Sequence, residues 1–241
     1  MNKIVSFGKT DCGLWRSNNE DTFMVRPEFG FFLVADGMGG AAAGELASRI
    51  FSETVAEIFS TAEGLPKDSA ELIQQAFGLA NDRILRHTEQ IPEHKGMGCT
   101  AELMVFSGDR FFIGHMGDSR TYRLKNGQFK QLTLDHSLVQ RQLDQGLITP
   151  QEARTHAMRN VILRAVGVDE TPALDLIRGN FSSGDLFLLC SDGLTDPVDD
   201  ADIADVLTKS LPLTQKADEL IELAKVGGGK DNITVVLIKI E

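Results

Sequence analysis

Seven short runs of apolar, aromatic and β-branched residues constrain the fold of this chain more than any other feature of its sequence. Runs of this length and composition are typical of buried β-strands. They lie at Phe29–Ala35, Ala101–Phe106, Arg110–His115, Thr121–Leu124, Phe129–Leu132, Leu186–Cys190 and Ile233–Ile240. Asn126-Gly127 connects two of them, and this dipeptide is the strongest short-range signal of a β-hairpin. We therefore expect antiparallel neighbours in the sheet.

The predicted helices fall in separate blocks before and after these strands. An apolar stripe with four-residue spacing predicts a helix over 46–58. A second helix is expected to begin at a capping box of Asp68 and Glu71, and two more lie near 201–209 and 214–225. This grouping favours a layered α+β fold over a repeating βαβ sheet.

One segment differs from the apolar strands around it. Residues 135–167 are polar and helical in pattern and fall between two strand regions. Within them, Thr149-Pro150-Gln151-Glu152 is a typical helix start. We predict a helical flap at about 135–167, inserted in a single domain that takes up residues 1–241.

The charge of the chain limits its partners. Its 35 acidic and 24 basic residues give a net charge of -11 at pH 7, which repels polyanions and argues against nucleic acid. No stretch of the sequence has the pattern of a signal peptide or the length of a membrane span. Cys12, Cys99 and Cys190 are widely separated and indicate neither a disulfide framework nor a zinc site. We expect a cytoplasmic protein without a membrane partner.

Four aspartates share an unusual context, because each lies at the end of a predicted strand, next to glycine or a glycine-rich segment. They are Asp36, Asp118, Asp192 and Asp231. An aspartate after a strand is most often a turn or helix-cap residue. Four converging carboxylates, however, would repel one another unless a cation lay among them, and oxygen-only ligands suit magnesium or manganese. Glycine lets the backbone approach such a site closely, so the carbonyl of Gly37 is a further candidate ligand.

A second group of charged residues, Arg16, Glu20 and Asp21, lies near the start of the chain. A surface arginine beside a solvated acidic pair is the simplest interpretation. Near a metal cluster, an arginine can instead bind a phosphate with two hydrogen bonds, and carboxylates can orient the waters on a metal.

Two glycine-rich segments raise a nucleotide-binding alternative. The loop 37–42 fits the dinucleotide pattern G-x-G-x-x-A, and Gly227-Gly228-Gly229-Lys230 resembles part of a phosphate-binding loop. Asp36 would then place a negative charge beside the pyrophosphate. Asp231 stands where a phosphate-binding loop needs serine or threonine to reach magnesium. Both observations argue against a bound nucleotide.

Seven motifs resemble, in order and spacing, those of the metal-dependent protein phosphatase family, also called the PPM or type 2C family, and especially its compact bacterial members. They are Arg16 with Asn19-Glu20-Asp21, Val34 to Gly40, His115 to Arg120, Leu132 to Ser137, Arg159 to Ile162, Ser191 to Asp196, and Gly229 to Thr234. The resemblance runs almost from end to end. It implies a four-layer α/β/β/α sandwich, in which two packed antiparallel sheets are flanked by helices on both outer faces.

The resemblance also implies roles for the central acidic residues. Asp36 would bridge two Mn²⁺ or Mg²⁺ ions, and Asp192 and Asp231 would complete the ligands of one of them. The carbonyl of Gly37 would bind the other ion. Asp118 would serve a third and weaker metal site.

The remaining charged residues near the start of the chain also gain roles from the resemblance. Glu20 and Asp21 would contact waters of the second metal, and Arg16 would hold the phosphate of the substrate.

Two positions depart from the family pattern. Met38 and Ala41 stand where relatives carry histidine, so neither candidate general acid is present. His136 or a metal-bound water remains as the proton donor to the leaving group. His115 alternates with apolar residues along its strand, so we expect it to face away from Asp118 and to be structural.

The function implied by the resemblance is hydrolysis of phosphoserine and phosphothreonine in proteins, by in-line attack of a metal-bridging hydroxide. The partners would be phosphorylated proteins, including a serine/threonine kinase or its substrates, and the phosphatase would be a monomer. Two alternatives remain: a catalytically inactive scaffold that binds phosphoproteins, and a metal-dependent nuclease. The complete aspartate set disfavours the first, and the acidic composition disfavours the second.

Overall fold

The computed structural model describes residues 3–39, 43–61 and 69–241, which form two antiparallel sheets packed face to face. The first sheet has the order β1-β11-β10-β7-β8, with β1 at Ile4–Asp11, β7 at Arg120–Lys125, β8 at Gln128–Gln131, β10 at Leu186–Cys190 and β11 at Ile233–Ile240. The second has the order β2-β3-β5-β6-β9, with β2 at Asp21–Arg26, β3 at Phe31–Met38, β5 at Ala101–Ser107, β6 at Arg110–Met116 and β9 at Asp175–Asn180. A short β4 at Gly98–Cys99 pairs with the end of β3.

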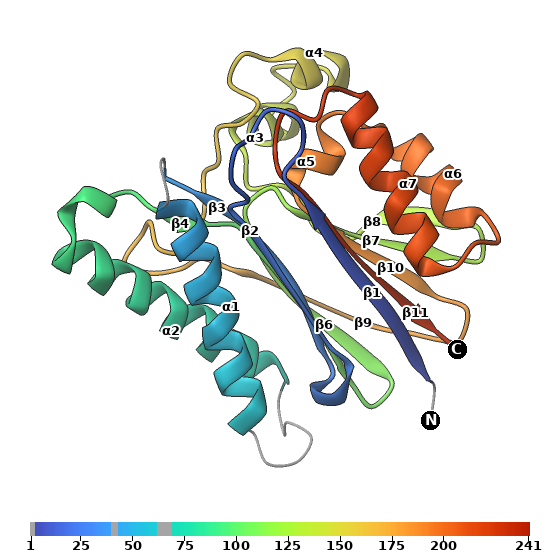
Figure 1. Cartoon of the computed structure of the whole chain (residues 1–241), viewed down its shortest axis with the longest axis horizontal. Helices are drawn as coiled ribbons and strands as arrows, with labels where there is room; N and C mark the ends of the chain where they lie inside the picture. The colour runs from blue at the N-terminus through green and yellow to red at the C-terminus, as the bar shows by residue number, and fades with distance from the viewer. Residues whose placement is uncertain (1–2, 40–42, 62–68) are drawn as a thin grey trace.

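Helices cover both outer faces of the two sheets (Figure 1). Helices α1 (Ala43–Thr61) and α2 (Ser69–Gln90) pack on the second sheet, and α6 (Asp200–Thr208) and α7 (Leu213–Val226) pack on the first. Short elements complete the chain: 3-10 turns at Pro27–Phe29 and Pro92–His94, and a helical turn, α5, at Asp192–Thr195. The predicted four-layer α/β/β/α sandwich is therefore confirmed.

Three apolar layers hold the sandwich together, as burial of the alternating strand faces requires. Side chains such as Phe32 and Leu189 fill the space between the sheets, where they are fully buried. Phe51 of α1 packs edge-on against Phe77 of α2 over the second sheet. On the other side, Leu220 belongs to the layer between α7 and the first sheet.

The seven predicted strands are all present, but four further strands were not predicted. One is the two-residue β4, and the others are β1, β2 and β9, each of which lies at an edge of its sheet. Their residues are mostly half-buried and less uniformly apolar than those of the central strands. A second difference concerns Asp36. Strand β3 continues to Met38 by pairing with β4, so Asp36 lies inside the strand and not after it.

The Asn126-Gly127 hairpin is confirmed between β7 and β8. Asn126 and Gly127 have φ values of +50° and +77°, and a type I′ turn requires positive φ at both central residues. In the part of the chain described, Asn126 alone among non-glycine residues has a positive φ. The turn therefore fixes the register of these two strands.

The helical segment predicted between the strands is also present, between β8 and β9. It contains α3 (Leu138–Asp144) and α4 (Pro150–Thr155), which lie at one end of the sandwich (Figure 1). The helix start predicted at Thr149 is present, and Thr149 and Glu152 form a capping box there, with each side chain bonded to the other's backbone N–H. The proposed cap at Asp68 lies outside the described residues. Within the described residues, no helix is long and apolar enough to cross a membrane.

Candidate active site

The predicted aspartates converge at one end of the sandwich, where strands of both sheets begin or end. Asp21 and Asp36 are directly opposite on β2 and β3, so their side chains lie on the same face. Asp192 begins α5, immediately after β10, and Asp231 lies just before β11. Asp118 follows the end of β6. Sheet packing thus brings together residues that are nearly two hundred positions apart in the sequence.

Asp36 lies at the centre of this group. Burial raises the pKa of its carboxyl well above the ordinary value, and the charges of Asp21 and Asp192 raise it further, followed by those of Asp118 and Asp231. The carboxyl of Asp192 is affected in the same way, first by burial and then by Asp118. Carboxylates that raise one another's pKa in this way are stable together only if protons or cations neutralise their charges.

Asp21 ties the two sheets together beneath the site. Its Oδ2 accepts hydrogen bonds from the hydroxyls of Ser191, at 2.8 Å, and Thr234, at 2.5 Å. Burial raises the pKa of Asp21 to about 6, although the two hydroxyls oppose that shift. Its other oxygen, Oδ1, has no hydrogen-bond partner among the described residues.

Unpartnered oxygens indicate what the site is built to hold. The Oδ1 atoms of Asp21, Asp118 and Asp192 are buried and lack a hydrogen-bond partner within the described part of the chain. Such atoms are costly unless a ligand satisfies them. Because all are carboxylate oxygens, a hard divalent cation such as Mg²⁺ or Mn²⁺ fits the donor set.

Among the described residues, no group of three or more acidic, histidine or cysteine side chains is arranged so that the side chains alone could hold a metal ion. Hard cations commonly complete their coordination with backbone carbonyls and waters. The residues therefore fit a cation site that the protein completes only in part.

Gly37 lies where backbone packs directly against backbone. A Cβ at Gly37 would come within 2.1 Å of the carbonyl oxygen of Gly44, so no larger residue fits. A Cβ at Gly44 would lie 2.8 Å from the Gly37 carbonyl oxygen and 2.7 Å from Oε2 of Glu20. The two oxygens therefore flank the same point at the start of α1. That Gly37 and Glu20 serve one metal stays a prediction.

Asp118 occupies a neighbouring position, between the central carboxylates and the flap. Burial, followed by repulsion from Asp135 and Asp196, raises its pKa to about 7. Asp118 and Asp192 both line a cavity of about 190 Å³ together with residues of α3 and α4. The flap thus closes over this side of the site. A different cavity lies beside Arg16.

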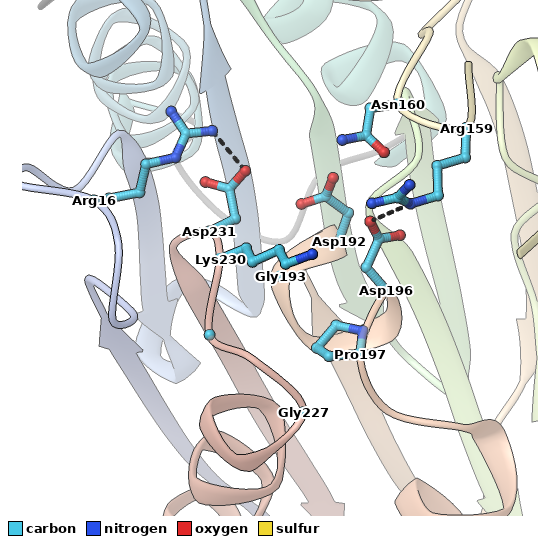
Figure 2. Close-up of a pocket in the computed structure, with 11 residues that line it drawn as sticks. Arg16, Arg159, Asn160, Asp192, Gly193, Asp196, Pro197, Gly227, Lys230 and Asp231 are labelled. Carbon is cyan, nitrogen blue, oxygen red and sulfur yellow. Dashed lines mark hydrogen bonds and ion pairs between the residues drawn. The ribbon is translucent and has the colours of Figure 1, made fainter. Parts of the chain in front are cut away.

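Arg16 reaches the site from the loop between β1 and β2. Its Nη2 donates to Oδ2 of Asp231 at 2.7 Å, and this contact raises the pKa of the guanidinium. Figure 2 shows the carboxylates of Asp192 and Asp231 at a cavity that both residues line, with the guanidinium of Arg16 bonded to Asp231. The cavity has a volume of about 250 Å³.

Several residues of this cavity were not predicted. Asp196 lies one helical turn after Asp192, so the i, i+4 spacing was a usable signal. Arg159 of the flap forms an ion pair with Asp196, at 3.5 Å, and Lys230 also lines the cavity (Figure 2). The cavity is therefore bordered by both cations and anions.

Asn232 was also not predicted, and its side chain links two distant segments of the chain. Its Nδ2 donates to the carbonyls of Cys12, at 3.2 Å, and Asn18, at 2.9 Å. Its Oδ1 accepts from the N–H of Glu20 at 2.8 Å. Asn232 thus fixes the loop that carries Arg16 against the start of β11. No local sequence pattern signals contacts over such a separation.

The two histidines near the site are structural in their contacts. His115 is fully buried and pairs with Glu102, as expected for a residue that faces away from Asp118. His136 accepts a hydrogen bond from the N–H of Gly117 at 3.2 Å. Burial and the charge of His115 lower the pKa of His136 to about 4. It is therefore neutral at pH 7, which disfavours the proposed role as general acid. Met38 ends β3, and Ala41 lies outside the described residues.

Comparison with known proteins gives consistent matches. The family model described as protein phosphatase 2C matches residues 16–226. The serine/threonine protein phosphatase PstP of Mycobacterium tuberculosis is 40% identical over 231 residues, which cover 95% of this chain but 43% of PstP. The serine/threonine phosphatase stp of Listeria innocua is 35% identical over 236 residues, which cover 96% of this chain and 94% of that protein. The chain thus spans less than half of PstP and nearly all of stp.

Solved structures agree with these matches. The crystal structure of PstP superposes with a TM-score of 0.92 at 38% sequence identity and covers 100% of both chains. The catalytic domain of PstP in complex with two manganese ions gives a TM-score of 0.90 at 37% identity, over 100% of this chain and 99% of that one.

Proposed function

The chain belongs to the protein phosphatase 2C family, and on that premise we propose that it is a metal-dependent phosphatase that hydrolyses phosphoserine and phosphothreonine in proteins. The observation that carries this proposal is the group of buried carboxylates around Asp36 with three unpartnered oxygens, beside an arginine able to bind phosphate. The scaffold alternative finds no support, because the relatives are named as phosphatases and every predicted metal carboxylate is present.

The residues divide between two cations, either Mn²⁺ or Mg²⁺. Asp36 would contact both, Asp192 and Asp231 would hold one, and the Gly37 carbonyl would hold the other. Such cations, when bound, activate water as the nucleophile and neutralise negative charge on the phosphate.

The protein also holds the surroundings of these ions. Glu20 and Asp21 would orient waters around the second cation. Asp118 would hold a third and weaker cation, supported by the unpartnered oxygen that it turns into the site.

Arg16 supplies the contact to the substrate. Its guanidinium donates to Asp231, which is itself a proposed metal ligand. A guanidinium at the edge of the cavity would bind two oxygens of the substrate phosphate.

The experiment that tests this function is hydrolysis of a phosphothreonine peptide with manganese, with magnesium and with excess chelator after metal removal. We expect turnover with either metal and none with the chelator, because the donor set consists of oxygen atoms. Undiminished turnover in the chelator would contradict a metal-dependent mechanism.

The flap at about 135–167 is proposed to select among protein substrates within one phosphatase domain of residues 1–241. Its α3 and α4 are polar and line the cavity beside Asp118, and loops on a rigid scaffold commonly carry specificity. Alanine at Gln140 and Asp144 should change rates on phosphoproteins but not on a small aryl phosphate. Parallel loss on both substrates would assign the flap to support of the metal site.

We further propose that the protein works as a cytoplasmic monomer on phosphorylated proteins, including a serine/threonine kinase or its substrates. The three cysteines are free thiols in the structure, which suits a reducing compartment. The net charge of -11 disfavours nucleic acid and anionic membranes as partners.

A further inference from the structure

The loop that carries Arg16 also presents an apolar surface to solvent. Leu14 is 64% exposed and Trp15 is 75% exposed, and Trp15 is the only tryptophan of the chain. Exposed tryptophan is uncommon, and adjacent exposed apolar side chains often mark a contact surface. We call Leu14 and Trp15 together the Trp15 platform.

The platform is held in place by the opposite loop. The indole N–H of Trp15 donates to the carbonyl of Gly228 at 3.1 Å, and the N–H of Leu14 donates to the carbonyl of Gly229 at 2.7 Å. The side chain of Leu14 also packs on Gly229, where a Cβ would lie 2.8 Å from its Cγ. A fixed aromatic ring loses little conformational entropy when it binds a partner.

The platform also lies at the edge of the proposed substrate site. Arg16, next in the sequence, lines the cavity, as do Gly229 and Lys230 of the loop to which the platform is bonded (Figure 2). A peptide whose phosphate is held by Arg16 therefore has neighbouring residues within reach of Trp15. An extended chain advances about 3.3–3.6 Å per residue, so the reach is about one to three residues from the phosphoresidue.

We propose that the Trp15 platform binds an apolar side chain of the phosphoprotein substrate, located within about three residues of the phosphoserine or phosphothreonine. The platform is aliphatic and aromatic, Arg16 follows it in the sequence and Lys230 belongs to the loop to which it is bonded, so leucine or phenylalanine is favoured over lysine or arginine. This inference rests on the proposed function. It adds a preference for the sequence around the phosphate.

The first test uses phosphothreonine peptides that carry a single leucine, serine or lysine at each of the three positions on either side of the phosphoresidue. For the wild type, kcat/KM should be about fivefold to tenfold higher with leucine than with serine at one or more positions. Trp15→Ala should abolish that preference, and Trp15→Phe should keep part of it. Hydrolysis of a small aryl phosphate should not change, because it does not reach the platform.

The matched control is Phe29→Ala. Phe29 is also an exposed aromatic residue, but it lies in the turn between β2 and β3, at the end of the strands opposite to Asp36. This variant should keep the leucine preference of the wild type. If Phe29→Ala and Trp15→Ala lose it equally, the platform is not the cause.

A second measurement does not depend on turnover. Because Trp15 is the only tryptophan, the tryptophan emission of the manganese-loaded protein reports on the platform, and peptides that carry a non-hydrolysable phosphonate in place of the phosphate keep turnover out of the measurement. Titration with the preferred leucine peptide should shift the emission, and the serine peptide should shift it only at higher concentration.

Three results would overturn the inference: equal rates for leucine and serine peptides at every position, a preference for lysine, or loss of aryl phosphate hydrolysis in Trp15→Ala. If the wild type hydrolyses no substrate at all, the proposed function fails instead. The fluorescence titration then decides the platform on its own.

Discussion

Two regions of this protein bury carboxylates, and they neutralise them in opposite ways. Between the strands of the two sheets, Glu102 is fully buried, but it pairs with His115 and accepts a hydrogen bond from Thr121 at 2.5 Å. At the end of the sandwich, Asp36 and Asp192 face other carboxylates. The first region contains its own counter-charge. In the second, Arg16 and Arg159 pair with Asp231 and Asp196, and no described residue forms an ion pair with Asp36 or Asp192.

The difference distinguishes a buried pair that stabilises the fold from a group of carboxylates that is suited to bind cations. Burial by itself would lower the pKa of His115, but the Glu102 carboxylate overrides this effect and raises the pKa of His115 to about 9, while burial raises the pKa of Glu102. In the Asp36 group, burial and repulsion both act in one direction and raise the pKa values. A fold keeps such an arrangement at a cost to its stability, and the natural explanation is a cation supplied from outside.

The largest effect is expected from Asp36→Ala or Asp192→Ala. Loss of a direct metal contact should reduce kcat/KM by more than the ~10–100-fold typical of residues one shell further out. The metal-free variants should be at least as stable as the wild type, because a repelled carboxylate has been removed. Steady-state kinetics and chemical denaturation measure the two quantities. A variant that unfolds in parallel with its loss of activity would contradict the distinction between the two regions.

Glu102→Ala should lower the stability of the fold and leave the activity of the folded protein unchanged. It leaves His115 buried without its partner, and breaking a buried pair costs about 3–5 kcal/mol in the free energy of unfolding. The protein that remains folded should retain its activity per molecule. Glu102→Gln, which keeps the shape and one acceptor, should cost less. An inactive Glu102→Ala of wild-type stability would show that this region takes part in the chemistry.

Manganese should stabilise the wild type and not Asp36→Ala. A ligand at one hundred times its Kd adds about 2.7 kcal/mol to the stability of the native state. At roughly 2–4 °C per kcal/mol for a domain of this size, Tm should rise by about 5–10 °C. Thermal unfolding with and without excess chelator measures the shift. An equal shift in Asp36→Ala would place the stabilising ion elsewhere.

The stability of the metal-free protein should depend on pH in two separate pH ranges, or windows, one for each region. Asp21 and Asp118, with pKa values raised to about 6 and about 7, keep protons in the folded state that the unfolded chain releases near pH 4. Stability should therefore fall as pH rises from about 4 to about 7. The Glu102–His115 pair contributes stability that is complete below about pH 6.5 and is lost as pH rises through about 9.

Saturating manganese separates the two windows. Because manganese binds deprotonated carboxylates, it should abolish the loss of stability between about pH 4 and pH 7. The loss of stability at alkaline pH should remain. The two shifts together amount to several kcal/mol, so the Tm of the metal-free protein should fall by at least about 10 °C across the lower window, and calorimetry at several pH values measures it. A metal-free Tm that rises from pH 4 to pH 7 would mean that the aspartates are not protonated in the folded protein.

The sequence predicted the central parts of this fold better than its edges. The central strands are buried on both faces, so they leave long apolar runs that can be recognised. Strands β1, β2 and β9 lie at sheet edges, where one neighbour is missing and half-exposed residues are tolerated, so no such run appears. Strand β3 also extended further than predicted, because its continuation to Met38 depends on pairing with the distant β4.

The site shows the same limit. Four aspartates beside glycines were recognisable because each position is fixed by the strand next to it. The hydrogen bonds of the Asn232 side chain were not recognisable, because their partners come from the other end of the chain. The ion pair of Arg159 with Asp196 depends on how the flap folds back. Contacts over such separations follow from the packing of the two sheets.

The position of β11 has a consequence for how the protein is made. This strand comes last in the sequence, yet it lies between β1 and β10, with Ile240 opposite Ile4 of the first strand. On the ribosome, β1 and β10 therefore emerge without their shared partner and expose apolar faces that chaperones recognise. Pairing between such distant segments also slows folding. Asp231 is synthesised just before β11, so the carboxylates come together only when translation of this sheet is complete, and a nascent chain is inactive until then.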